Sequence, residues 1–394
     1  MFTRRLFLKA GGVALFTLGA GPGFLNRAAL AATGRRKVLV TIFQRGAMDG
    51  LMAVTPLSED LRSLRPRLAM PAKELLDLGT GFGLHPAFEP LLPLWKEKRL
   101  GIVHAVGSPD PTRSHFDAQD YMETGTPGRK GTASGWLNRA VGLLGHEGSP
   151  FRAVSLTPAL PRSLYGDEPA LAVADLADFK APAAGQSFEA LYAQTSQKVL
   201  QETAGDTFEA MQMLTPEKVN RYRPANGAEY PASPLGQALR QIALLIKSDV
   251  GLEVAFAESG GWDTHVQQGI SFTRQARDLS RSIHAFWTDL GPSWQDGVLL
   301  STMTEFGRTV RENGSGGTDH GHGSCLFVLG NQVQGGKVHG AFPALDALYE
   351  GRDLPVTTDF RSVFCELAGK HLGIRDDGRL FPGWSGKRLP LLAG

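Results

Sequence analysis

The 394-residue sequence predicts an α/β fold in which a mainly parallel central sheet carries helices on both faces. Short, continuous apolar runs alternate along the chain with longer segments whose apolar residues recur at helical spacing. Continuous apolar strands are buried on both faces, as in parallel sheets covered by helices. Polar clusters follow several of these runs, which is where ligands gather in open α/β sheets.

The elements follow from these patterns in chain order. The predicted strands are Val38–Phe43, Gly101–Val106, Ala153–Leu156, Leu171–Val173, Leu252–Ala257, Val298–Met303 and Cys325–Leu329. The predicted helices are Phe88–Lys98, Phe188–Leu214, Leu235–Lys247 and Phe272–Leu290. No linker separates independent domains, so residues 32–394 are expected to form a single domain with a helical excursion near residues 177–250.

The N-terminus has the features of a twin-arginine signal peptide. Arg4 and Arg5 precede a weakly apolar, glycine-rich run from Ala10 to Leu25, and Ala29-Leu-Ala31 is an A-x-A cleavage site. We therefore expect residues 1–31 to be removed after export by the twin-arginine machinery, to the periplasm or the medium. The apolar run is too short and too interrupted for a comfortable membrane span, so no stable span is expected in the mature chain.

Charge and cysteine content exclude several classes of function. Loss of residues 1–31 removes four basic and no acidic residues, which changes the formal net charge from +2 to −2. Such a balance gives no basic field for nucleic acid or anionic lipid. The two cysteines, Cys325 and Cys365, either pair or remain buried thiols, and without a Cys-x-x-Cys motif they support neither an iron–sulfur cluster nor a thiolate zinc site.

The segment from Ser301 to Gly323 contains the densest group of potential metal ligands. Carboxylates and imidazoles occur there among glycines that let the backbone bend: Glu305, Asp319, His320 and His322. Such residues beyond a strand end suit a divalent metal ion. The alternative is a flexible loop whose histidines are solvated or bonded to the backbone.

Two further strand ends carry candidate ligands. Asp263 and His265 are two residues apart, so in extended backbone they project to the same side and could share one ion. Asp263 could instead cap the helix that follows, with His265 on the surface. Asp49 lies in a glycine-bounded turn after the first strand and either binds metal or serves the turn.

The strand ending at Val106 leads to candidate catalytic residues. Arg113, Ser114 and His115 precede a predicted helix. Ser114 either caps this helix or acts as a nucleophile that gains from the helix dipole. Arg113 could hold an anionic substrate by paired hydrogen bonds. Arg308 is either a structural ion-pair partner or an anion clamp. The chain has no G-x-S-x-G elbow, P-loop or H-E-x-x-H motif.

Several motifs together resemble the exported family called domain of unknown function 1501. Besides the leader, they are Phe43-Gln-Arg-Gly-Ala-Met-Asp-Gly-Leu51, Gly83-Leu-His-Pro86, Arg113-Ser-His-Phe-Asp-Ala-Gln-Asp-Tyr121, Gly135-Trp-Leu-Asn-Arg139, Gly260-Gly-Trp-Asp-Thr-His265, Thr304-Glu-Phe-Gly-Arg-Thr309 and Thr318-Asp-His-Gly321. That family is similar to the alkaline phosphatase and sulfatase superfamily. The resemblance implies an alkaline-phosphatase-like sheet with metals at its strand ends.

The same resemblance implies roles for individual residues. Asp49 would match the first-strand metal carboxylate, and Asp263 with His265 an Asp-and-His pair. Either Glu305, or Asp319 with His320, would match a second pair, and His322 or His320 the final histidine. Ser114 would lie near the nucleophile position.

We expect a divalent-metal-dependent hydrolase of small phosphate or sulfate esters. Arg113 or Arg308 would stabilise charge on the transferred group. The alternative is a non-catalytic exported binding or assembly protein, perhaps with a structural metal; Phe306, where a second ligand could follow Glu305, favours it.

Overall fold

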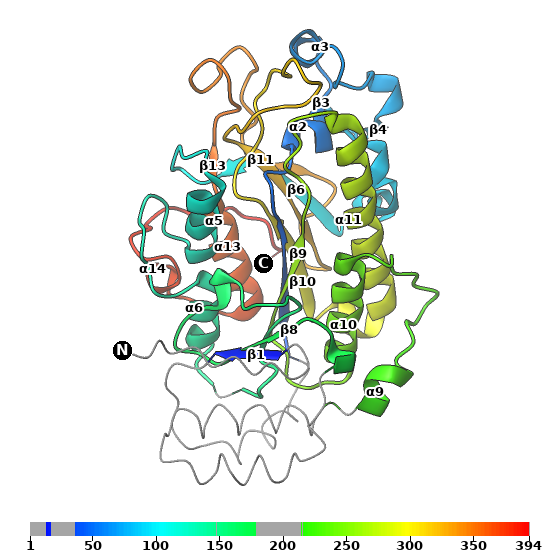
Figure 1. The fold of residues 1–394 in the computed structure, drawn as a ribbon, viewed down its shortest axis with the longest axis vertical. Helices are drawn as coiled ribbons and strands as arrows, with labels where there is room; N and C mark the ends of the chain where they lie inside the picture. The colour runs from blue at the N-terminus through cyan, green and yellow to red at the C-terminus, as the bar shows by residue number, and fades with distance from the viewer. Residues whose placement is uncertain (1–12, 17–35, 147, 179–213, 215, 394) are drawn as a thin grey trace.

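The computed structural model describes residues 13–16, 36–146, 148–178, 214 and 216–393. In this part of the chain a ten-stranded sheet has the order β1-β8-β7-β9-β2-β10-β11-β6-β12, and β13 also pairs with β6 (Figure 1). Its strands are β1 (Val13–Phe16), β2 (Val38–Gln44), β6 (Leu100–Gly107), β7 (Ala153–Ser155), β8 (Ala170–Val173), β9 (Val254–Ser259), β10 (Val298–Met303), β11 (Ser324–Leu329), β12 (Val338–His339) and β13 (Thr358–Asp359). All seven strands predicted from the apolar runs are present.

The sheet is mainly parallel, as predicted. Strands β8, β7, β9, β2 and β10 are parallel neighbours. Strand β11 runs antiparallel to both β10 and β6, so β6 points the same way as β10. The loop from Thr304 to Gly323 explains this reversal, because it leaves β10 and enters β11 at the same edge of the sheet.

Helices cover both faces of the sheet (Figure 1). On one face lie α10 (Pro234–Lys247) and α11 (Gln268–Leu290), and on the other α5 (His115–Thr124), α6 (Trp136–Leu143), α13 (Phe360–Leu372) and α14 (Asp377–Leu380). Strand β2 shows why two cores form. Val40 and Ile42 belong to the core beneath α10 and α11, whereas Leu39 and Phe43 belong to the core beneath α6 and α13. Alternate side chains of a strand point to opposite faces, so a wholly apolar strand needs cover on both.

The remaining elements surround the main sheet. The helical ones are α2 (Gly50–Ala53), α3 (Glu59–Leu64), η2 (Ala72–Glu74), η3 (Pro86–Leu91), α4 (Leu92–Lys96), η4 (Arg162–Leu164), η5 (Leu176–Asp178), α9 (Pro216–Arg221) and α12 (Pro292–Gln295). A second sheet has the order β3-β5-β4, made of β3 (Val54–Pro56), β4 (Leu76–Asp77) and β5 (Phe82–Leu84). The predicted helix Phe88–Lys98 is divided between η3 and α4, because it contains Pro90 and Pro93. Residues 188–213 of the predicted helix Phe188–Leu214 lie outside the described residues.

Three features bear on the leader, the membrane and the thiols. Strand β1 lies inside the predicted leader and pairs with β8 at the end of the sheet, so the predicted cleavage would remove it. None of the helices in the described part of the chain combines the length and hydrophobicity needed to cross a bilayer. Cys325 and Cys365 are both buried free thiols.

Candidate metal centre

Four segments that are distant in sequence meet at the edge of the sheet where β2, β6, β9 and β10 end. β6 leads into α5, which begins at His115, and β9 leads into the turn containing Asp263 and His265. The loop after β10 folds back on itself: the Gly307 N–H donates to His322 O at 2.7 Å, and Arg308 forms an antiparallel bridge with His320. The parallel arrangement therefore brings these segments together, as the sequence predicted.

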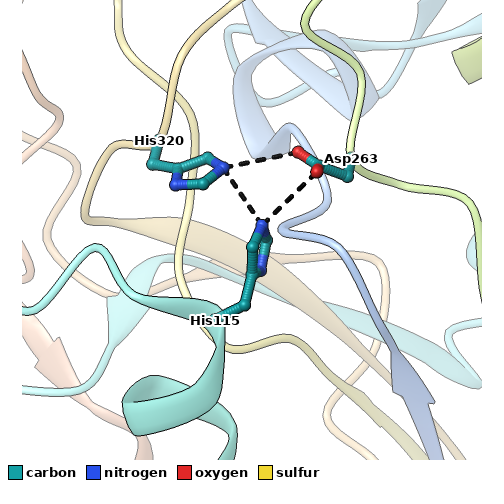
Figure 2. Close-up of side chains that lie close together, drawn as sticks. All are labelled: His115, Asp263 and His320. Carbon is teal, nitrogen blue, oxygen red and sulfur yellow. Dashed lines mark hydrogen bonds and ion pairs between the residues drawn. The ribbon is translucent and has the colours of Figure 1, made fainter.

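Two histidines and one carboxylate, His115, His320 and Asp263, converge at this edge (Figure 2). Nε2 of His115 lies 3.0 Å from Nε2 of His320 and 3.6 Å from Oδ2 of Asp263. Nε2 of His320 lies 3.4 Å from Oδ1 of Asp263. Nε2 of His265 joins them at 2.9 Å from His320 Nε2 and 3.0 Å from Asp263 Oδ1. We call these four residues the histidine–aspartate cluster.

The other ring nitrogen of each histidine contacts an oxygen atom. The three Nδ1 contacts are His115 to Glu305 Oε1 at 2.8 Å, His320 to the Arg113 carbonyl oxygen at 2.8 Å, and His265 to Asp319 Oδ1 at 3.1 Å. Carbonyl and carboxylate oxygens only accept hydrogen bonds, so each Nδ1 must donate. A neutral imidazole that donates from Nδ1 has a lone pair at Nε2. The oxygen atoms that accept from Nδ1 therefore orient all three rings so that the Nε2 lone pairs face the centre of the cluster.

A divalent cation accounts for this arrangement better than protons do. Lone pairs and carboxylate oxygens face one another at 2.9–3.6 Å, which is repulsive without a positive charge between them. One proton relieves one contact, but His320 Nε2 faces two rings and Asp263 at once. Ligand atoms bound at about 2.0–2.1 Å in a tetrahedral site are about 3.3 Å apart, close to the observed spacings. The residues present therefore fit a metal ion.

Electrostatics support the assigned protonation states of Glu305 and His320. The hydrogen bond with Glu305 raises the pKa of His115 above its ordinary value, which favours a protonated His115 ring until a cation takes the place of the proton at Nε2. Burial alone would raise the pKa of Glu305, but hydrogen bonds from His115, Gln119 and the Gly46 N–H lower it, so the carboxylate is charged. Burial lowers the pKa of His320, which favours the neutral ring and its free lone pair.

Arg308 holds Asp263 in place from behind the cluster. Its side chain is fully buried, and Nη2 donates to Asp263 Oδ1 at 2.6 Å. Nη2 also donates to the carbonyl oxygens of Gly46 and Trp262, and Nε and Nη1 donate to those of Ala47 and Thr318, so Arg308 binds three segments of this edge. Burial tends to raise the pKa of Asp263, but the hydrogen bond from Arg308, together with the charges of Arg308, His265 and His115, lowers that pKa below its ordinary value. Arg308 thus positions a cluster residue instead of facing solvent.

The cluster is open to solvent on one side and apolar on another. The Asp263 side chain is 47% exposed, and that of His265 is 39% exposed. Phe306 is buried, and its ring lies 5.0 Å from the rings of both His115 and His320. Phe306 therefore forms a wall beneath the two histidines, while a small molecule can approach from the side of Asp263.

The structure places four predicted ligands outside the cluster: Glu305 and Asp319 contact Nδ1 of His115 and His265, and Asp49 and His322 have other partners. Asp49 caps α2 through the Met52 N–H and pairs with the buried Arg65, with Oδ2 2.8 Å from Nη1. The Gln268 amide also donates to Asp49 Oδ2. His322 is buried and has Nε2 3.0 Å from the Ser108 carbonyl oxygen.

The candidates around Ser114 have different environments. The Arg113 guanidinium binds Asp353 and Glu350, and its backbone carbonyl holds His320. Ser114 is exposed and occupies the N-cap position of α5, yet its side chain makes no capping hydrogen bond. The hydroxyl is therefore not committed to the helix.

Gln119 is a site residue that the sequence analysis did not identify. Its amide donates to Glu305 Oε1 at 2.9 Å, the same oxygen that binds His115. Positions four apart on a helix share one face, so the spacing of His115 and Gln119 on α5 was the available signal. Sequence alone could not show that Glu305 lies opposite that face.

Together the fold and the cluster define a mainly parallel α/β protein with a histidine–aspartate centre at the carboxyl edge of its sheet. The model of the family described as "Protein of unknown function (DUF1501)" matches residues 61–382, so the chain belongs to that family. A search of curated proteins finds no match.

The chain is also similar to solved structures at low sequence identity. The C-terminal periplasmic domain of EcEptC from Escherichia coli, in complex with Zn, is 10% identical over 76% of this chain and 73% of that chain, with a TM-score of 0.36. The lipoteichoic acid synthase LtaP from Listeria monocytogenes is 8% identical over 90% and 74%, with a TM-score of 0.37. The alkaline phosphatase of the Antarctic bacterium TAB5 is 10% identical over 75% and 92%, with a TM-score of 0.30. At these TM-scores the likeness says nothing about activity.

Proposed function

We propose that this protein is an exported, metal-dependent hydrolase of phosphate or sulfate esters. The observation that carries the proposal is the convergence of three Nε2 lone pairs with the Asp263 carboxylate at a solvent-open edge. A site preset to bind a cation and open to small molecules suits metal-assisted ester hydrolysis.

The donor set indicates which cation the cluster would hold. His115, His320 and Asp263 would bind it, and His265 would supply a further nitrogen. Three imidazoles with one carboxylate suit Zn²⁺ and related transition metals, whereas Mg²⁺ and Ca²⁺ prefer oxygen ligands. When bound, such an ion supplies Lewis-acid chemistry, which polarises the ester oxygen and compensates developing charge.

The remaining residues would bind and orient the substrate. Ser114 presents a free hydroxyl at the N-terminus of α5, beside His115, so either this hydroxyl or a water is the attacking group. The first backbone N–H groups of α5 favour an anionic group at the same place. Arg308 and Glu305 hold Asp263 and His115 in position and do not touch the substrate.

The test combines elemental analysis with a substrate panel. The purified full-length chain is loaded with Zn²⁺ or Mn²⁺, and turnover of aryl phosphates and aryl sulfates is measured. We expect about one ion per chain and metal-dependent turnover, both lost in His115→Ala and His320→Ala. His284→Ala, which changes a histidine of α11 outside the cluster, serves as the control. Absence of both bound metal and metal-dependent turnover would refute the proposal.

The second candidate is a non-catalytic exported binding protein with a structural ion. It is favoured by one observation: the cluster residues come from three separate segments, which a cation would cross-link. In that case metal removal lowers the melting temperature of the wild type, and no ester in the panel is turned over.

Export is proposed from the twin-arginine pattern at the N-terminus. Changing Arg4 and Arg5 together to Lys is expected to keep the protein in the cytoplasm, because the receptor reads the arginine pair. Cell fractionation with an antibody measures this, and export unaffected by the change would contradict the leader assignment.

A further inference from the structure

Exposed large apolar side chains follow two of the cluster histidines in the chain. Among the described residues the large apolar side chains that are strongly exposed are Phe116 at 91%, Ile270 at 74%, Val266 at 60% and Leu57 at 41%. Phe116 directly follows His115, and Val266 directly follows His265. Ile270 lies in the first turn of α11, four residues after Val266. Three of the four therefore belong to segments that supply cluster histidines.

Phe116, Val266 and Ile270 belong to two of the segments that meet at the cluster. The His320 ring lies between the others, with its centroid 4.3 Å from that of His115 and 4.7 Å from that of His265. Phe116 is on the α5 side, and Val266 and Ile270 are on the side where α11 begins. A single exposed apolar residue such as Leu57 needs no special explanation, but a set around one polar site is typical of ligand contact.

We propose that Phe116, Val266 and Ile270 form an apolar rim that binds the organic group of the substrate. The inference rests on the proposed function, in which the cluster holds the anionic group of the ester. Binding sites commonly combine a few polar groups that fix orientation with apolar contacts that supply affinity. The rim therefore assigns the substrate to esters of aryl or extended alkyl groups, in preference to esters of small or polar alcohols.

Two non-hydrolysable ligands test the rim without requiring turnover. Phenylphosphonate and methylphosphonate carry the same anionic group and differ in the apolar part. Their dissociation constants for the Zn²⁺-loaded full-length chain are measured by calorimetry. We expect phenylphosphonate to bind about tenfold tighter, the typical effect of a modest apolar contact.

Variants locate the source of this preference. Phe116→Ala, and separately Val266→Ser with Ile270→Ser, are expected to bring the ratio of the two dissociation constants toward one. Leu57→Ala is the matched control, because it truncates an exposed apolar residue next to β3, and it should keep the wild-type ratio. Metal content is measured in each variant to show that the cluster is intact.

The outcomes separate this inference from the proposed function. Equal binding of the two phosphonates by the wild type, or a ratio that all rim variants keep, overturns the rim. A preference lost in the variants, combined with no ester turnover, supports the rim and contradicts the hydrolase. Binding of neither compound overturns both. A wild-type dimer that Phe116→Ala converts to monomer assigns the rim to contact between copies and overturns substrate binding.

Discussion

Replacing Glu305 by Gln alters the charge behind His115 with little change in shape. Oε1 of Glu305 accepts hydrogen bonds from the Gly46 N–H at 2.8 Å, from His115 Nδ1 at 2.8 Å and from Gln119 Nε2 at 2.9 Å. The oxygen of a Gln side chain can occupy the same place. Its NH₂ group would then face the Thr304 hydroxyl, which lies 3.1 Å from Oε2 and can accept. All three donors keep an acceptor, and only the negative charge is lost.

The expected effect is on metal affinity more than on folding. Hydrogen-bonded partners of metal-binding histidines contribute about 10- to 100-fold in affinity, which corresponds to about 1.4–2.7 kcal/mol. We therefore expect Glu305→Gln to bind Zn²⁺ about 10- to 100-fold more weakly. Glu305→Ala differs, because it leaves three donors without a partner at a fully buried site. Each lost partner costs about 1–3 kcal/mol, so this variant should lose about 3 kcal/mol or more of unfolding free energy.

Competition with a chromophoric chelator at constant pH measures the affinity. Glu258→Gln is the matched control, because it removes a carboxylate at the end of β9 that binds Arg45 and no cluster histidine. It should bind Zn²⁺ as the wild type does. Wild-type affinity in Glu305→Gln, or an equal loss in Glu258→Gln, would refute the role of Glu305 as the outer partner of His115.

Three further predictions concern stability. Arg308→Lys cannot reproduce the hydrogen bonds of the planar guanidinium and leaves Asp263 without its partner. Urea unfolding should therefore show that the variant loses about 3 kcal/mol or more of unfolding free energy. A loss of unfolding free energy below about 1 kcal/mol would be inconsistent with this. Burial lowers the pKa of His104 to about 4, so its stabilising contribution is complete above the unfolded-state pKa of about 6.5 and falls as pH decreases toward 4. Between pH 7 and pH 4.5 the unfolding free energy of the wild type, measured by urea unfolding, should fall by about 2 kcal/mol more than that of His104→Gln. An equal fall in both proteins would contradict this. Gly317→Ala places a Cβ 2.2 Å from the His265 carbonyl oxygen, whereas the Cβ of the control Gly314→Ala meets open space. Thermal denaturation should therefore show a lower melting temperature for Gly317→Ala than for Gly314→Ala. Equal melting temperatures of the two variants would argue against the close approach.

Much of the fold could be predicted from the sequence because apolar strands in a covered sheet have a simple pattern. The run Val38–Phe43 became β2 with one additional residue, and Val298–Met303 became β10 with the predicted bounds. The direction of β11 could not be predicted, because a strand buried on both faces has the same apolar pattern in either direction. The division of Phe88–Lys98 was signalled by Pro90 and Pro93.

For the site, the sequence predicted which segments meet but not which atoms face one another. Parallel strands end at a common edge, and this brought His115, Asp263 and His320 together. Side-chain directions in the loops depend on partners distant in sequence. Asp49 points to Arg65, and Glu305 points to Nδ1 of His115, so neither choice could be read from local spacing.

The most direct test of the metal centre is X-ray absorption spectroscopy of the Zn²⁺-loaded chain, together with its metal stoichiometry. The proposed cluster predicts about one ion per chain, bound by nitrogen and oxygen only, with three imidazoles. In His320→Ala, which removes the ring at the centre of the contacts, stoichiometric binding should be lost. No bound ion in the wild type, or binding that survives His320→Ala unchanged, would contradict the account.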